Sequence, residues 1–160
     1  MIAKFTILVD SREQNPWFFE GITKEVRGVT HKIEVPTVVR GLKTGDYTID
    51  GYEDKICVER KSIQDLIGTI TRGRDRFQNE LERMQAMEFS AVVVEGNWNK
   101  VLKQCFSTTR MNPVSLDSSM TAFMMRFPRT HWMFRPGRFA AMKTAYKIFD
   151  IYLRRIVNNG

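Results

Sequence analysis

Residues 45–61 read GDYTIDGYEDKICVERK, two β-rich segments on either side of the turn-forming residues Gly51–Asp54. Aromatic and β-branched side chains around a short polar turn predict a β-hairpin. If the turn holds just those four residues, Tyr47 faces Val58, and both side chains point into a buried layer on one face of the hairpin. The other face of the same hairpin then carries the charged residues.

Two carboxylates meet on that charged face. The register sets Asp46 directly opposite Glu59, with Lys61 on the same face because side chains alternate along a strand. Like charges opposed across an antiparallel pair destabilise a sheet, and at about 5 Å between β-carbons each raises the pKa of the other. A divalent cation removes this conflict, and oxygen ligands without His or Cys suit Mg²⁺ or Mn²⁺. Asp10, at the end of the first predicted strand, can supply a third carboxylate if that strand lies nearby. The alternative is a solvated strand end of mixed charge, which needs no ion.

The composition bounds the class of protein. The chain has 160 residues, 42% of them hydrophobic and 27% charged, so we expect residues 1–160 to form a single domain. Lys plus Arg number 25 against 18 for Asp plus Glu, and the net charge of +7 favours a polyanionic partner. No apolar run is long enough to cross a bilayer, and neither Cys57 and Cys105 nor the two histidines have disulfide or zinc spacing. We therefore expect no membrane partner and an intracellular location, in the cytoplasm, nucleoid or nucleus.

The remaining patterns predict an α/β fold in the order ββββααβααβα, a mixed β-sheet flanked by helices. Strands are predicted at Phe5–Val9, Ile33–Val39, Asp46–Asp50, Lys55–Lys61, Ala91–Glu95 and Thr130–Phe134. Helices are predicted after Ser62, around Phe77–Met87, at Asn97–Cys105, from Pro113 to before Pro128, and at Arg138–Val157. Pro36 marks its strand as an edge strand or a bulge.

Three ordered motifs resemble one family. Gly45-Asp46-Tyr47, then Val58-Glu59-Arg60-Lys61 and, three residues on, Asp65 are similar to the GDx(n)ERKx₃D signature of XPF-type structure-selective endonuclease domains, a branch of the PD-(D/E)XK nucleases. Val9–Glu13 resembles the VDxRE segment of that family, and Arg74, Phe77 and Leu81 resemble its arginine-and-aromatic helix. The resemblance covers nearly the whole chain and implies a restriction-endonuclease-like fold.

The resemblance implies a Mg²⁺-dependent endonuclease, with Mn²⁺ as a substitute cofactor, that cleaves branched or flapped DNA in repair, recombination or replication. Asp46, Glu59 and Asp10 would ligate the metal, and Lys61 would orient the attacking water and stabilise the developing charge. Arg60 and Asp65 complete the implied catalytic set. Alternation turns Arg60 to the other face, however, where it more readily holds a loop or Asp65 than a phosphate, and Asp65 can equally cap its helix.

Arg72, Arg74 and Arg76 cluster at the start of a predicted helix, where the dipole disfavours cations. We predict phosphate contacts for these arginines together with Lys61, and a solvated helix end is the alternative. The family works as homo- or heterodimers, so the apolar helix Arg138–Val157 is the expected interface, with burial in the monomer core as the alternative.

Two further functions stay open. One is a catalytically silent DNA-binding subunit that supports a nuclease partner, and the other is a restriction-like enzyme that reads DNA sequence. The tandem helix-hairpin-helix modules common in the family have no counterpart after Arg138. The resemblance thus implies that a partner supplies junction recognition or that the enzyme works without it.

Overall fold

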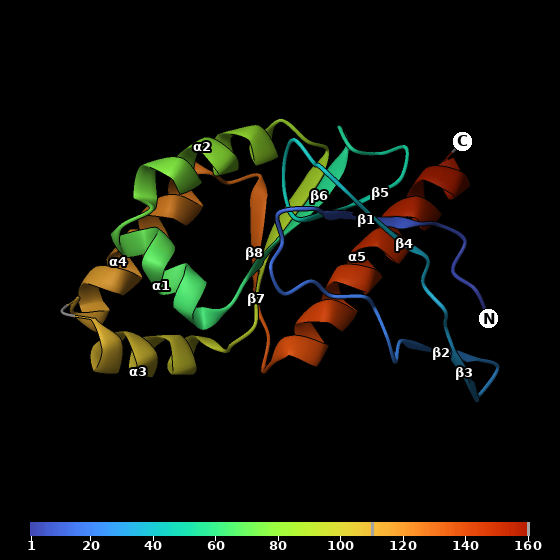
Figure 1. Ribbon diagram of the computed structural model, residues 1–160, viewed down its shortest axis with the longest axis horizontal. Helices are drawn as coiled ribbons and strands as arrows, with labels where there is room; N and C mark the ends of the chain where they lie inside the picture. Colours follow the sequence, from blue (N-terminus) through green and yellow to red (C-terminus); the bar gives the residue numbers. More distant parts are fainter. Residues whose placement is uncertain (110, 160) are drawn as a thin grey trace.

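The computed structural model describes residues 1–109 and 111–159, with side chains described up to residue 156. A six-stranded sheet in the order β4-β1-β5-β6-β7-β8 forms the centre, and β2 and β3 form a separate two-stranded sheet (Figure 1). The strands are β1 (Ile7–Asp10), β2 (Thr23–Val26), β3 (Val29–Lys32), β4 (Thr37–Arg40), β5 (Tyr47–Ile49), β6 (Ile56–Lys61), β7 (Phe89–Val94) and β8 (Thr130–Phe134). The helices are α1 (Ile63–Thr71), α2 (Arg74–Gln85), α3 (Trp98–Thr108), α4 (Pro113–Arg126) and α5 (Arg138–Asn159).

The sheet is mixed, as the sequence predicts. β1 runs antiparallel to β5 and β5 antiparallel to β6, whereas the β1-β4, β6-β7 and β7-β8 pairs are parallel. Two cores lie on its two faces: one contains Val58 and the buried face of α5, and the other contains Cys57 and the buried faces of α1 to α4. Neighbouring residues of β6 therefore point into different layers, and Glu59 lies on the α1–α4 side by alternation.

The hairpin has the predicted register, because Tyr47 pairs with Val58. Its turn is longer than predicted and spans residues 50–55 rather than Gly51–Asp54. The Asp50 N–H donates to the carbonyl of Thr6 at 3.0 Å, next to β1, and not to β6. The β5 strand therefore ends at Ile49, one residue earlier than predicted.

The N-terminal third differs from the prediction in two places. The strand predicted at Ile33–Val39 begins only after Pro36, which has no N–H for a ladder. β4 is an edge strand, in agreement with the role predicted for that proline. The β2-β3 hairpin was not predicted, because its strands are charged and largely exposed and its turn uses Arg27 and Gly28, at φ of 51° and 78°, in place of Asn-Gly.

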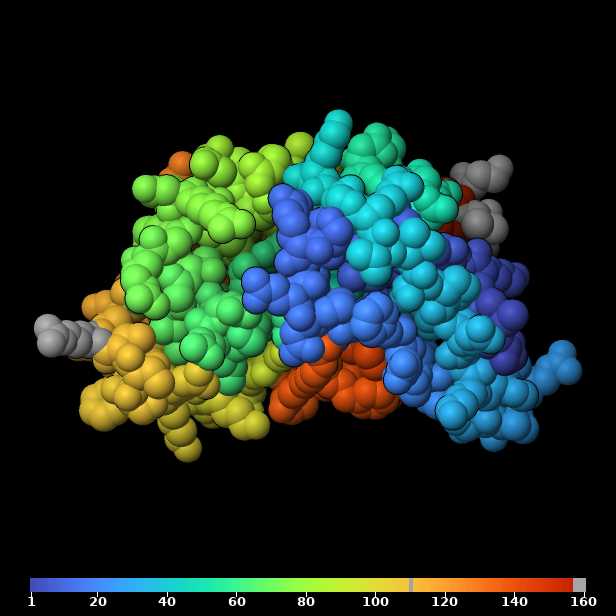
Figure 2. Space-filling model, in the orientation of Figure 1, coloured from blue at the N-terminus to red at the C-terminus, as the bar shows by residue number. Residues whose placement is uncertain are grey.

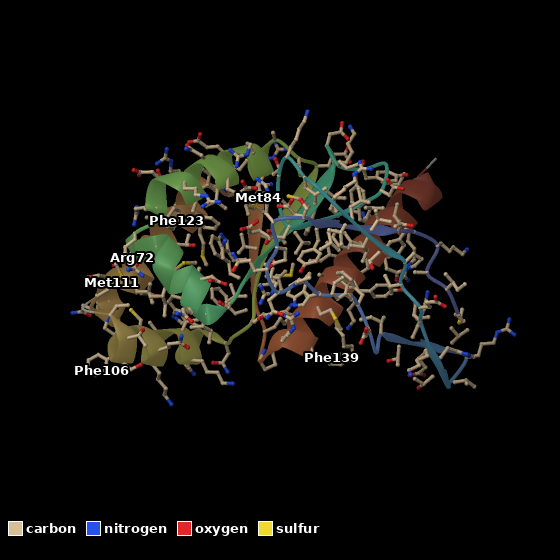
Figure 3. The ribbon with its side chains drawn as sticks, in the orientation of Figure 1. Arg72, Met84, Phe106, Met111, Phe123 and Phe139 are labelled. Atoms are coloured by element: carbon tan, nitrogen blue, oxygen red, sulfur yellow. The ribbon has the colours of Figure 1, made fainter. Side chains whose placement is uncertain are left out.

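The helix α5 buries one stripe in the monomer. Ala141, Ala145 and Phe149 are fully buried against the sheet. Phe139 and Ile151 remain 52% and 53% exposed, and Figure 3 shows Phe139 near the start of the helix. Burial in the core of the monomer, the alternative to a dimer interface, thus accounts for most of the apolar surface of α5. The dimer stays a prediction. In the part of the chain that the structure describes, no helix has the length and hydropathy needed to cross a bilayer.

Candidate active site

Asp46, directly before β5, and Glu59, within β6, lie side by side. The Asp46 N–H donates to the Val58 carbonyl at 3.0 Å, and the Asp46 carboxylate accepts the N–H of Arg60 at 2.7 Å. Burial and the negative charge of Glu59 raise the pKa of Asp46 to about 9. Burial also raises the pKa of Glu59, against the opposing effect of Lys61. The structure therefore brings together the two carboxylates that the register sets opposite each other, at a cost in repulsion.

Lys61 supplies a cation next to this pair. Its Nζ lies 2.6 Å from a carboxylate oxygen of Glu59 and 5.0 Å from the centre of the Phe77 ring. Burial alone would lower the pKa of Lys61, but the Glu59 carboxylate raises it above its ordinary value. The ammonium group is thus held in its charged form beside the two acids.

Glu80, which the sequence patterns did not single out, ties α2 to this site. Its carboxylate accepts the Gly45 N–H at 2.7 Å, and its charge helps to raise the pKa of Glu59. Gly45 has φ of +71°, and a Cβ there would lie 2.8 Å from the Cβ of Cys57, so only glycine fits this approach to β6. Helix periodicity could have found Glu80, because it lies three residues after the buried Phe77 and so on a neighbouring face of α2.

Asp10 lies next to the pair along the backbone, but its side chain is engaged elsewhere. The Asp10 N–H donates to the Asp46 carbonyl at 2.8 Å. The carboxylate of Asp10, however, accepts bonds from Arg12 Nε at 2.8 Å and from the Leu42 N–H at 3.1 Å. The described residues contain no group of three or more His, Cys, Asp or Glu placed to hold a metal ion. This corrects the prediction that Asp10 joins Asp46 and Glu59 as a third ligand: Asp10 holds the loop that follows β4.

Arg60 is turned to the opposite face, as alternation predicts. Its guanidinium forms two bonds with Glu95, at 2.8 and 3.0 Å, and one with Glu13 at 3.1 Å. Glu95 also accepts from Trp17 Nε1 at 2.7 Å and from Arg138 Nη1 at 3.1 Å. Glu13, on the loop after β1, and Glu95, after β7, are thereby fixed to β6. Arg60 holds a loop, in agreement with the prediction, and its partners are these two glutamates.

The molecular surface is hollowed beside this site. Figure 2 shows the hollow between the green surface of α1 and α2 and the blue segment that follows β1. Glu59 and Lys61 belong to the last part of β6, directly before α1. The side chains of Lys61 and Glu59 are mostly buried there, 15% and 10% exposed.

Comparison with known proteins settles the family. The family model described as the ERCC4 domain matches residues 9–137. The chain belongs to the ERCC4 domain family. XPF from Aeropyrum pernix has a similar structure, with a TM-score of 0.67 and 20% identity over 96% of this chain and 67% of that one. XPF from the same organism in complex with DNA gives a TM-score of 0.67 and 19% identity over 95% and 66% of the two chains. Among curated proteins, none matches. The restriction-endonuclease-like fold is thus confirmed.

Within this ERCC4 domain, Asp65 lies in the first turn of α1 and bonds to the N-cap residue Ser62. Its N–H donates to Ser62 Oγ at 3.0 Å, and the same hydroxyl donates to the Asp65 carboxylate at 2.6 Å. The first bond is the N-cap bond of a capping box, and the second joins the two side chains. Asp65 is exposed, and its charge also helps to raise the pKa of Lys61. The helix-cap alternative accounts for these bonds, and a catalytic role of Asp65 stays a prediction.

The ERCC4 domain separates the three arginines predicted to bind phosphates. Arg72 and Arg76 are exposed, at the end of α1 and the start of α2. Arg74 instead packs on α4: its guanidinium lies 4.8 Å from the centre of the Phe123 ring, and Nη1 donates to Ser119 Oγ at 3.3 Å. Figure 3 shows Arg72 at the end of α1. Arg74 thus has a packing role, Arg72 and Arg76 are accessible, and phosphate contacts by the three arginines stay a prediction.

Proposed function

We propose that this ERCC4 domain is a metal-dependent endonuclease that hydrolyses phosphodiester bonds in branched or flapped DNA. The observation that carries the proposal is the adjacent carboxylate pair Asp46 and Glu59, with the Lys61 ammonium 2.6 Å from Glu59. Membership of the ERCC4 domain family supports a nuclease, and the similar XPF structure in complex with DNA supports DNA as the substrate.

The donor set fits a divalent cation. Mg²⁺ in proteins takes one or two carboxylates and completes its shell with water and phosphate oxygens, so a pair without a third acid is sufficient. Asp46 and Glu59 would hold the ion, with the Arg60 carbonyl as a further oxygen, and Mn²⁺ would substitute. When bound, the ion would neutralise phosphate charge and lower the pKa of a water molecule. The raised pKa of Asp46 is the mark of a carboxylate that lacks a compensating cation.

The surrounding side chains position the pair and the substrate. The raised pKa of Lys61 keeps it protonated, so it stabilises negative charge that develops on the phosphate and does not act as a general base. The Arg60 N–H fixes the Asp46 carboxylate, and the Arg60 side chain fixes β6 through Glu13 and Glu95. Arg72 and Arg76 would contact phosphates farther along the DNA, since Arg72 follows the last residue of α1 and lies roughly 14 Å from its first residue, and Arg76 lies in the first turn of α2.

A panel of labelled flap, fork, four-way-junction and linear duplex DNA, with Mg²⁺ or with a chelator, tests the proposal. We expect Mg²⁺-dependent cleavage of the branched substrates and little cleavage of the linear duplex. Cleavage of linear duplex at one defined sequence would instead indicate the restriction-like enzyme. Binding to DNA without cleavage under any divalent ion would indicate the catalytically silent subunit.

Mg²⁺ is expected to raise the melting temperature more at pH 8 than at pH 5. A carboxyl group whose pKa is raised in the folded state stabilises the metal-free protein below about pH 4, and this contribution is lost as the pH rises towards about 9. A cation bound to both carboxylates offsets that loss, and it competes with the proton at low pH. At an Mg²⁺ concentration about 100 times Kd the gain is about 2.7 kcal/mol, which is roughly 5–10 °C.

Calorimetry at the two pH values, with Mg²⁺ or with KCl of equal ionic strength, measures this difference. Equal shifts at pH 5 and pH 8 would contradict binding at the carboxylate pair.

Glu80→Ala is expected to lower the rate of DNA cleavage about tenfold, because Gly45 loses the acceptor that holds it beside Asp46. Glu80→Gln keeps an amide oxygen for the Gly45 N–H and should cleave at close to the wild-type rate. Single-turnover cleavage of flap DNA by the two variants measures the difference. A Gln variant as slow as the Ala variant would show that the negative charge of Glu80 matters, rather than its bond to Gly45.

A further inference from the structure

A groove with a volume of about 210 Å³ runs between β2 and α5, on the face of the sheet remote from the candidate active site. Its walls include Ile22 and Tyr146, which are buried in the same core as Val58. Glu59 alternates with Val58 along β6 and points to the other face. Residues of β2 line one side of this groove and residues of α5 line the other, and Figure 1 shows the β2-β3 hairpin at the lower right of the molecule.

Three lysines from two elements line the groove: Lys24 from β2, and Lys143 and Lys147 one turn apart on α5. Lys24 and Lys143 are half-buried, and Lys147 is exposed. In the part of the chain that the structure describes, the lysines with a carboxylate partner are Lys55 and Lys61, so these three charges are not compensated. Like charges one turn apart on a helix destabilise it slightly, and the groove brings a third charge against them.

The other charged side chains of the groove leave this excess in place. Arg154 forms an ion pair with Asp150, which cancels both charges, and Glu25 is the remaining acid among the lining residues. The balance of the described lining is therefore positive.

We propose that this groove, called here the α5 groove, binds backbone phosphates of a second DNA segment while another segment lies at Asp46 and Glu59. Lysine binds phosphate as a point charge without reading sequence, and charges in succession along an open groove suit a strand of phosphates better than a single ion. Because the two places lie on opposite faces of the sheet, different segments of the DNA occupy them. The proposal rests on the proposed function for the nature of its ligand.

The test compares two double variants that lose the same charge. Lys143→Gln/Lys147→Gln removes two lysines of the α5 groove, and Lys100→Gln/Lys103→Gln removes two exposed lysines of α3. Binding to fluorescent flap DNA and to a short linear duplex is measured by anisotropy across a salt series, with Asp46→Asn in every protein so that the DNA stays intact. The sedimentation behaviour of all variants should match that of the Asp46→Asn parent, which excludes effects of folding or assembly.

We expect the groove variant to bind flap DNA about tenfold or more weakly. The slope of log binding constant against log salt concentration should become less steep by the amount that corresponds to about two phosphate contacts. The α3 variant and the short duplex should change less than about threefold. Equal losses in the two variants, or no loss in either, would refute the α5 groove as a DNA site. A calorimetric titration with inorganic phosphate separates the sources of the ligand: phosphate uptake at the groove with unchanged DNA affinity also refutes the proposal.

Failure of the proposed function gives a different result. Wild-type protein that binds flap DNA through these lysines but cleaves nothing refutes the endonuclease and leaves the α5 groove standing. Wild-type protein that cleaves flap DNA, with equal binding by both double variants, refutes the α5 groove alone.

Discussion

Asp46→Asn is expected to reduce DNA cleavage by at least about a thousandfold while it stabilises the metal-free protein. The asparagine oxygen can still accept the Arg60 N–H, so the hairpin keeps its geometry. At pH 8 the metal-free protein must either take up a proton at Asp46 or bury its charge beside Glu59, and asparagine removes this cost. We expect a gain of about 1–2 kcal/mol at pH 8, or roughly 2–8 °C in melting temperature, because active-site charges are kept at a cost in stability.

Asp50→Asn is the matched control on the same hairpin. Asp50 is 56% exposed and lies 3.8 Å from Arg40, so its charge is solvated and far less constrained. Its replacement should change neither cleavage nor melting temperature by much. Cleavage by the Asp46→Asn variant at more than a tenth of the wild-type rate would contradict the assignment of Asp46, as would a fall in its metal-free melting temperature.

Glu95→Ala is expected to cost about 3–5 kcal/mol of stability, since breaking a buried ion pair leaves its partner charge uncompensated. Arg60, whose side chain is 6% exposed, would keep only Glu13. Trp17 Nε1 and Arg138 would each lose an acceptor. The variant should melt roughly 6 °C or more below wild type, measured by calorimetry.

Glu82→Ala is the control for Glu95→Ala, because the Glu82 pair with Arg126 is more than half exposed on both sides. Exposed pairs contribute little, so this variant should melt within about 2 °C of wild type. Equal melting temperatures for the two variants would mean that the bonds around Glu95 do not hold β6, β7 and the loop after β1 together.

Most of the hairpin and the central sheet could be predicted because their signals come from residues that are close together in the sequence. The register that pairs Tyr47 with Val58 follows from the turn and from alternation, and both are properties of neighbouring residues. The β2-β3 hairpin gave no such signal, since Thr23–Val26 and Val29–Lys32 bury little. The α5 groove was missed with it, because Lys24 and Lys143 are distant in sequence and meet only in the folded chain.

The side chains of the candidate site likewise fall into two groups, those on one hairpin and those that contact distant parts of the chain. Asp46, Glu59 and Lys61 belong to one hairpin, so their proximity could be predicted from residue spacing. Residue spacing does not show the contacts of side chains whose partners come from elsewhere in the fold. Arg12 and the Leu42 N–H hold the Asp10 carboxylate, and α4 provides the surface on which the Arg74 guanidinium packs.

Diffraction from crystals grown with Mn²⁺ tests most directly whether the carboxylate pair is a metal site, because the anomalous signal locates the ion independently of any activity. An anomalous peak within about 2.5 Å of both the Asp46 and Glu59 carboxylates, absent from crystals of Asp46→Asn, is the predicted result. Crystals soaked at saturating Mn²⁺ that show no peak between these side chains, or a peak only elsewhere, would contradict it.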